Sequence, residues 1–99
     1  MSIDETLEIL RRAAPELKAR YGVSGARVFG SVARGEADAF SDVDVAVRFE
    51  GGHPVDVMSL CGVSGLLSGL FGRTVDVVTL SPRDPALAAA LERDGIGAF

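Results

Sequence analysis

The stretch that decides the fold runs from Val28 to Arg48 and reads VFGSVARGEADAFSDVDVAVR. It places a Gly-Ser turn after one apolar segment, and two aspartates at alternate positions at the start of a second apolar segment. Residues two apart on a strand point to the same face, so Asp42 and Asp44 are predicted to stand side by side. Adjacent carboxylates repel each other unless a cation lies between them. The pair therefore indicates a site for a hard divalent ion such as Mg²⁺, which takes oxygen ligands and shares its coordination sphere with nucleotide phosphates.

The spacing of these residues is also distinctive. Gly30-Ser31, ten further residues and Asp42-Val43-Asp44 resemble the Gly-Ser…Asp-x-Asp signature of the DNA polymerase beta-like nucleotidyltransferase superfamily. The fuller string, Gly-Ser-x-x-Arg-Gly-Glu-x-x-x-x-Ser-Asp-x-Asp, is similar to the minimal nucleotidyltransferases, small proteins often encoded beside a HEPN-domain toxin. A lone Asp-x-Asp would carry little weight, because it is common at solvated strand ends. Here several residue types match at fixed spacings.

The periodicity of apolar residues predicts alternating helices and strands. With the resemblance, it implies an α/β fold with a small mixed β-sheet, the polymerase beta-like nucleotidyltransferase core, and helices packed on it. Ser2 and Glu5 form a capping-box pattern for the first helix, and Gly22 ends it, although Pro15 can kink or divide that helix. Cys61 and Leu70 fall on the expected inward stripe of the second helix, whose three glycines either weaken it or allow close packing. The final Gly-Ile-Gly-Ala-Phe is expected to be a tail, tucked in by Ile96 and Phe99. The expected helices cover residues 3–21, about 54–71, and a last stretch that begins between 81 and 85 and ends at about 93. The expected strands cover 26–30, 43–49 and 74–79.

Composition limits the class of protein. The chain has 99 residues, of which 47% are hydrophobic and 24% charged, so residues 1–99 are predicted to form one globular domain. The formal charge of −4 argues against a broad nucleic-acid-binding face. The single cysteine, Cys61, is expected to be a buried thiol in a reduced, cytoplasmic protein. No segment approaches the roughly 18 apolar residues of a membrane span.

A third acidic residue is expected to complete the metal site. The third strand is expected to be buried through Val75, Val77 and Val78, and Asp76 lies among them. Burying a carboxylate there is expensive unless something compensates it. The superfamily resemblance implies a third carboxylate on a neighbouring strand, and Asp76 matches that position best. Asp56 is the competing candidate, although an acidic residue near a helix start is already favoured by the helix dipole.

Three residues of the motif suit phosphate binding. Gly30 lacks a side chain, so phosphate oxygens can approach its backbone, and Ser31 offers an amide and a hydroxyl. The forked guanidinium of Arg34 matches phosphate oxygens in charge and geometry. A salt bridge from Arg34 to Glu36 or Asp38 is the structural alternative.

The expected mechanism uses two Mg²⁺ ions. Asp42 and Asp44 would hold one ion with the triphosphate, and with Asp76 a second ion near the attacking hydroxyl. Such a hydroxyl has a pKa near 10 or above in water, so metal coordination or Asp76 as general base would have to activate it.

The resemblance implies an ATP-dependent antitoxin. Its expected partner is a HEPN ribonuclease toxin, bound in a hetero-oligomer and neutralised by transfer of AMP to a tyrosine. Two alternatives remain open from the residues alone. The chain could neutralise its partner only by covering it, or it could transfer a nucleotide to a small molecule.

Overall fold

The sheet at the centre of this protein is mixed, as the sequence predicts. The computed structural model describes residues 2–35, 42–50, 57–79 and 85–99. The strand order is β3-β2-β1-β4, with β2 and β3 parallel and the other pairs antiparallel. The elements are α1 (Ile3–Tyr21), β1 (Val23–Phe29), α2 (Gly30–Ala33), β2 (Val43–Phe49), α3 (Val57–Phe71), β3 (Val75–Thr79), α4 (Pro85–Asp94) and β4 (Ile96–Gly97).

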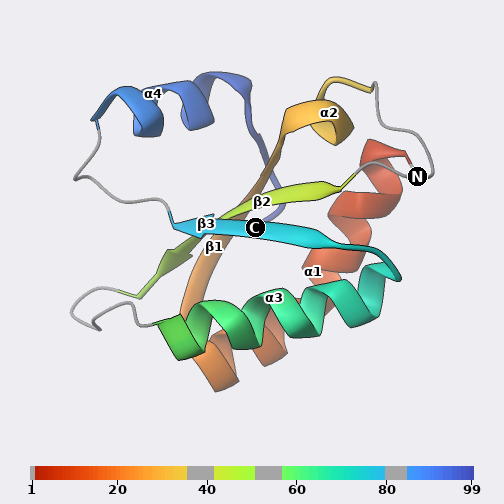
Figure 1. The fold of residues 1–99 in the computed structure, drawn as a ribbon, viewed down its shortest axis with the longest axis vertical. Helices are drawn as coiled ribbons and strands as arrows, with labels where there is room; N and C mark the ends of the chain where they lie inside the picture. The colour runs from red at the N-terminus through yellow and green to blue at the C-terminus, as the bar shows by residue number, and fades with distance from the viewer. Residues whose placement is uncertain (1, 36–41, 51–56, 80–84) are drawn as a thin grey trace.

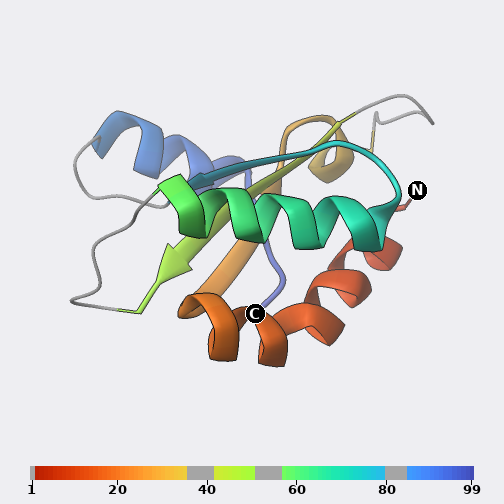
Figure 2. The ribbon, with the colours of Figure 1, turned by 60° about the horizontal axis from the view of Figure 1, so that its bottom comes forward.

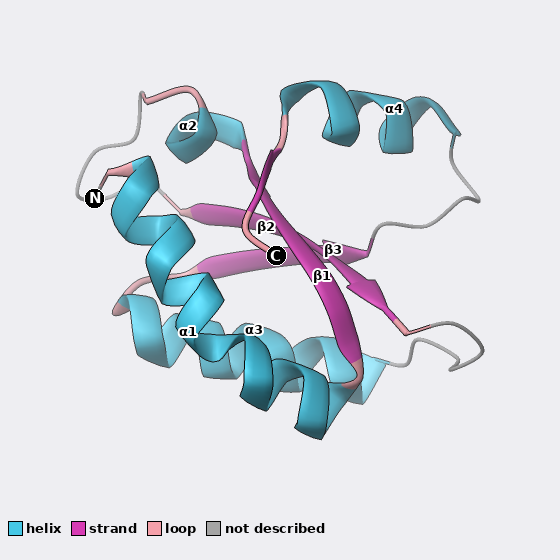
Figure 3. Cartoon of the chain, turned by 180° about the vertical axis from the view of Figure 1, so that it is seen from behind, coloured by secondary structure: helices cyan, strands magenta, loops and turns pink. Residues whose placement is uncertain are grey.

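The helices lie on both sides of this sheet. Figures 1 and 3 show α1 and α3 next to each other on one side, and α2 and α4 at the other. The parallel pairing of β2 and β3 requires a crossover, and α3 supplies it. Among the described residues, no helix is both long enough and apolar enough to cross a membrane.

Helix α1 begins and ends as its sequence predicts. The Ser2 side chain accepts a hydrogen bond from the Glu5 amide at 3.2 Å, and Gly22 takes a left-handed conformation with φ 72°. The helix runs through Pro15 as one element, so the proline does not divide it. Leu10 and Leu17 are fully buried on either side of the proline, and this packing holds both halves against the same core.

The core forms between the sheet and the pair α1 and α3. Val43, Val45 and Val47 alternate along β2 and are fully buried there. Helix α3 presents Val63 and Leu67 to the same core. The predicted stripe on α3 was wrong at two positions, since Cys61 is exposed and Leu70 is 50% exposed. A helix without charged residues gives no polar face to orient it, so its rotation is set by packing.

Other element boundaries also differ from prediction. β1 begins at Val23 rather than at residue 26, because it extends to pair with Phe49 across a register irregularity. Gly30 is the first residue of α2 and not the last of the strand. β3 starts at Val75, and the prediction that Val78 is buried was wrong, since it is 36% exposed on this edge strand. The expected helix start at residue 54 lies outside the described residues.

The predicted tail is a fourth strand. β4 pairs antiparallel with β1, and the Ala98 amide donates to the Ala26 carbonyl at 2.9 Å. Arg11 and Arg27 donate to the carbonyls of Ala98 and Gly95 at 2.9 and 2.7 Å. The buried apolar anchor is Ala98, at 6% exposure, whereas the predicted anchors Ile96 and Phe99 stay exposed.

The glycines of α3 have different surroundings. A Cβ added at Gly62 would lie 2.5 Å from the Tyr21 ring, so this glycine lets α1 and α3 approach closely. A Cβ added at Gly65 would meet no atom within 4 Å, and the same holds for Gly69. Close packing therefore explains Gly62 only.

These surroundings predict opposite effects of alanine at two positions. Gly65→Ala should raise the free energy of unfolding by up to about 1 kcal/mol, because alanine favours the helix and nothing obstructs its methyl group. Gly62→Ala should lower it by roughly 1 kcal/mol or more, because the Tyr21 ring has to move. Urea unfolding of both variants measures the difference, and equal stabilisation by both would contradict the packing described for Gly62.

Candidate active site

Parallel pairing of β2 and β3 brings two carboxylates together. Asp44 lies directly in register with Asp76, and their neighbours Val43 and Val75 are turned into the core. Both aspartates therefore project from the other face of the sheet. Asp44 is partly buried, whereas Asp76 is exposed. The expectation that Asp76 is a buried carboxylate was wrong, because β3 is an edge strand; what singles out Asp76 is its register with Asp44.

The charges around Asp44 change its proton affinity. Burial raises the pKa of Asp44 above its ordinary value, and the negative charges of Asp76 and Asp42 raise it further. The cation of Arg34 acts in the opposite direction and lowers the pKa. The structure thus brings Asp42, Asp44, Asp76 and Arg34 within electrostatic range of one another. A bound cation would relieve the repulsion between these negative charges.

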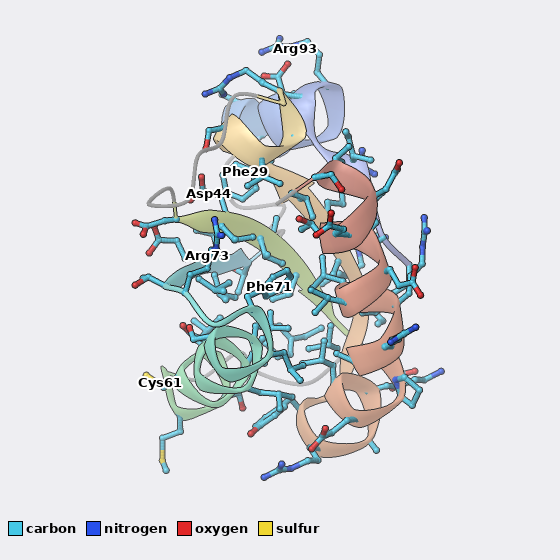
Figure 4. The ribbon with its side chains drawn as sticks, turned by 90° about the vertical axis from the view of Figure 1, so that its right-hand side faces the viewer. Phe29, Asp44, Cys61, Phe71, Arg73 and Arg93 are labelled. Atoms are coloured by element: carbon cyan, nitrogen blue, oxygen red, sulfur yellow. The ribbon has the colours of Figure 1, made fainter. Side chains whose placement is uncertain are left out.

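A sharp turn closes this site on the β1 side. Phe29 is paired with Asp44 across the sheet, and Gly30 follows with φ 73°, a conformation that favours glycine. Figure 4 shows Phe29 and Asp44 close together beneath α2. A Cβ at Gly30 would overlap the Asp44 carboxylate. Gly30 therefore serves two purposes, a left-handed turn and close approach to the carboxylate, and Ser31 is half-buried immediately after it.

Arg34 ends the short helix α2. Its amide donates to the Gly30 carbonyl at 3.2 Å, and its side chain is exposed. The alternative partners predicted for it, Glu36 and Asp38, lie outside the described residues. So does Asp56, the competitor of Asp76.

The described carboxylates do not form a complete metal cage. Within residues 2–35, 42–50, 57–79 and 85–99, no three histidine, cysteine, aspartate or glutamate side chains are placed as a group that could hold a metal ion. Mg²⁺ commonly takes only one or two protein carboxylates and completes its octahedron with waters and substrate phosphates. Asp44, with Asp42 and Asp76 near it and an open side toward solvent, fits an ion that arrives with a nucleotide.

Sequence reasoning did not single out Phe29. Directly opposed residues of an antiparallel pair share a face, so its ring lies on the same side of the sheet as the Asp44 carboxylate. The only signal in the sequence was its place immediately before Gly30. The register of β1 and β2 was needed to show that it borders the site.

Residues 10–96 match the nucleotidyltransferase domain family. The chain belongs to this family. Protein adenylyltransferase MntA of Thermococcus cleftensis is 34% identical to this nucleotidyltransferase over 94 residues, which cover 95% of this chain and 93% of the relative. A solved structure of a candidate minimal nucleotidyltransferase is 41% identical, has a TM-score of 0.75, and covers 97% of this chain and 95% of its own. The family predicted from the Gly-Ser…Asp-x-Asp spacing is confirmed.

A more distant solved structure shares the fold. It contains the MNT antitoxin in complex with a tri-AMPylated HEPN toxin of Shewanella oneidensis. That match has a TM-score of 0.65 at 17% identity and covers 94% of this nucleotidyltransferase and 71% of the other chain. At this identity the likeness supports the α/β architecture, whose predicted class is confirmed.

The contact between Gly30 and Asp44 predicts a strong effect of substitution. Gly30→Ala should lower the free energy of unfolding by about 1–3 kcal/mol, because alanine is strained at φ 73° and its methyl group would displace the carboxylate. Gly35→Ala is the matched control, since Gly35 has φ 72° and no atom within 4 Å of an added Cβ. Thermal unfolding should show a smaller loss for the control. Equal losses would mean that backbone strain alone accounts for the glycine.

The raised pKa of Asp44 predicts how stability depends on pH. The folded chain favours the protonated form of Asp44. The stability that this preference contributes is fully present below the ordinary pKa of 3.8, and it is lost as the pH rises through the raised pKa of the folded state. At neutral pH without divalent cations, Asp44→Asn should therefore melt about 1–3 °C higher than wild type, a small effect because solvent screens a partly exposed group. The difference should shrink as the pH falls toward 3.8.

Differential scanning calorimetry across this pH range, with EDTA present, measures the effect. Glu50→Gln is the control, because Glu50 is exposed and follows the opposite end of β2. An equal rise in melting temperature for this control would show that any lost negative charge stabilises the acidic chain. In that case the crowding of carboxylates at Asp44 would not be the cause.

Proposed function

We propose that this nucleotidyltransferase transfers AMP from ATP to a tyrosine of a HEPN-domain ribonuclease toxin and thereby neutralises it. The observation that carries the proposal is the in-register pair Asp44 and Asp76 beside the Gly30 turn. Support comes from the 34% identity, over nearly the whole chain, to a protein adenylyltransferase. Further support comes from the shared fold of an MNT antitoxin found with a tri-AMPylated HEPN toxin.

The nucleotide would bind at the turn between β1 and α2. Gly30 leaves its backbone accessible to phosphate oxygens, and Ser31 adds an amide and a hydroxyl as donors. Arg34, whose cation already acts on Asp44, can pair with the same phosphates. These groups would hold the triphosphate against an otherwise acidic surface.

Asp42 and Asp44 would hold one Mg²⁺ with the triphosphate, and Asp76 would help hold a second near the acceptor. Bound Mg²⁺ neutralises phosphate charge and lowers the pKa of a coordinated hydroxyl. The described carboxylates suit this role, because their mutual repulsion is relieved by a cation. The sequence-based assignment of two ions remains part of the proposal.

In the transfer step the acceptor tyrosine oxygen forms a bond to the α-phosphorus of ATP. The bond from that phosphorus to the α,β-bridging oxygen breaks, and pyrophosphate leaves. Asp76 is exposed and can accept the phenolic proton. The products are the AMP ester of the tyrosine, pyrophosphate and a proton, which balances the reaction.

The double substitution Asp42→Asn, Asp44→Asn should reduce AMP transfer by about a thousandfold or more, because it removes the charges that would hold the metal and its phosphates. The measurement is intact-mass analysis of the product of the neighbouring gene, expected to be the HEPN-domain toxin, after its incubation with this chain, ATP and Mg²⁺. Each transferred group should add the mass of one AMP residue, and tandem mass spectrometry should place it on tyrosine. EDTA should abolish the gain.

Glu50→Gln should transfer AMP as wild type does, since this residue follows the far end of β2. Complex formation between toxin and each variant is measured in parallel. If wild type binds and inhibits the toxin with no gain in mass, the chain acts by covering its partner, and the transferase proposal is wrong. Addition of AMP to a residue other than tyrosine would overturn the assigned acceptor only.

A further inference from the structure

A groove lies between α1 and α3, on the side of the sheet away from the carboxylates. Figure 2 shows the two helices next to each other along this side. The groove is lined by Ile9, Arg12, Ala13, Glu16 and Leu70. Half of the Leu70 surface is exposed there, although leucine side chains are usually buried. The groove thus has an apolar floor with charged side chains along one edge.

The charged edge is a ridge of four residues at steps of four along α1, namely Glu8, Arg12, Glu16 and Arg20. Within the helix, Arg12 pairs with Glu8 at 2.8 Å and Arg20 pairs with Glu16 at 2.9 Å. Exposed pairs of this kind contribute little to the stability of a single chain. The order of the signs is more informative, because it alternates along the whole ridge.

Alternating signs at equal steps make this ridge complementary to its own reverse. When a second copy of α1 crosses the first in the opposite direction about a two-fold axis that passes between Arg12 and Glu16, Glu8 lies opposite Arg20. Arg12 then lies opposite Glu16, so every charge of the ridge meets the opposite sign. Ridges of residues four apart are also those that interlock in the commonest packing of two helices. A two-fold axis makes such an interface self-complementary.

The apolar part of the groove is centred on the same axis. Leu70 lines the groove together with Arg12 and Glu16, the two residues between which the axis passes. The Leu70 side chains of two copies would therefore meet near the axis and lose their exposed surface to each other. A symmetric interface with an apolar centre and a charged rim results.

The charge of this face also permits association. Two copies of a chain with a net charge of −4 repel each other. The ridge has two glutamates and two arginines, so its own charge is zero. The helix on the other side of the groove, Val57–Phe71, contains no charged residue at all. Two acidic chains can therefore approach through α1 and α3 without adding to the general repulsion.

We propose that this nucleotidyltransferase forms a symmetric homodimer through α1 and α3, with the α1 ridges antiparallel and the Leu70 side chains in contact at the axis. Because the groove lies across the sheet from Asp44, both sites of the dimer stay open to substrate. The proposal does not depend on which acceptor the enzyme uses.

Charge reversal at two positions tests this arrangement. In the Arg12→Glu variant, the new glutamate would face Glu16 of the second copy. In the Glu16→Arg variant, the new arginine would face Arg12 of the second copy. Each variant therefore creates two contacts between like charges in every dimer. Sedimentation velocity over a concentration series should show wild type associating to a dimer, and both single variants at least about tenfold weaker. The double variant with both reversals restores the opposite signs and should dimerise again.

Mixing the two single variants is the sharper test. Their opposed residues 12 and 16 have opposite signs in a mixed pair, so an equimolar mixture should form a heterodimer that neither variant forms by itself. Leu70→Ser should weaken the wild-type dimer without any change of charge, and Glu50→Arg should leave it intact. Circular dichroism melting confirms that each variant is folded.

Three results would overturn the proposal. The first is a wild-type chain that stays monomeric throughout the concentration series. This result counts against the dimer even if the groove binds the toxin. The second is a dimer that persists unchanged in both single variants. The third is failure of both the double variant and the mixture to restore association.

Discussion

The parallel pairing of β2 with β3 is the constraint on which this structure depends. It fixes Asp44 opposite Asp76, and it turns the alternate valines of both strands into the core. A slip of one residue would bury the carboxylates and expose the valines, so hydrophobic burial enforces the register that the site requires. The energy that stabilises the fold and the geometry that builds the site thus come from the same strand pair.

This register has an electrostatic cost. Two negative side chains, Asp42 and Asp76, lie near the partly buried Asp44, and Arg34 offsets only part of their repulsion there. Gly30 adds to the crowding, because its backbone lies so close to Asp44 that any side chain at this position would overlap the Asp44 carboxylate. Such concentrations of like charge are typical of functional sites, where a ligand supplies the missing charge. A metal with a nucleotide is a ligand of the required kind.

The remaining strands and helices support this pair from both sides. β1 lies along the other edge of β2, carries Phe29 to Asp44 and leads into the Gly30 turn. The chain's last residues hold β1 in turn, through β4 and through the hydrogen bonds that Arg11 and Arg27 donate to backbone carbonyls. α1 and α3 cover the inner face and leave the outer face open at the carboxylates. Substrate access and association through α1 and α3 therefore use different surfaces.

The sequence by itself determined the family, and through it the mixed sheet. It also determined the full extent of β2 and the limits of α1, because these depend on local signals: alternating valines, a serine cap and a terminal glycine. It also placed Gly30, Ser31, Asp42 and Asp44 in one short segment. Only tertiary structure decided that Asp76 stands in register with Asp44, that Cys61 and Leu70 are exposed, and that the tail is a strand. Register, helix rotation and edge exposure arise from contacts between residues distant in sequence, and no local pattern encodes them.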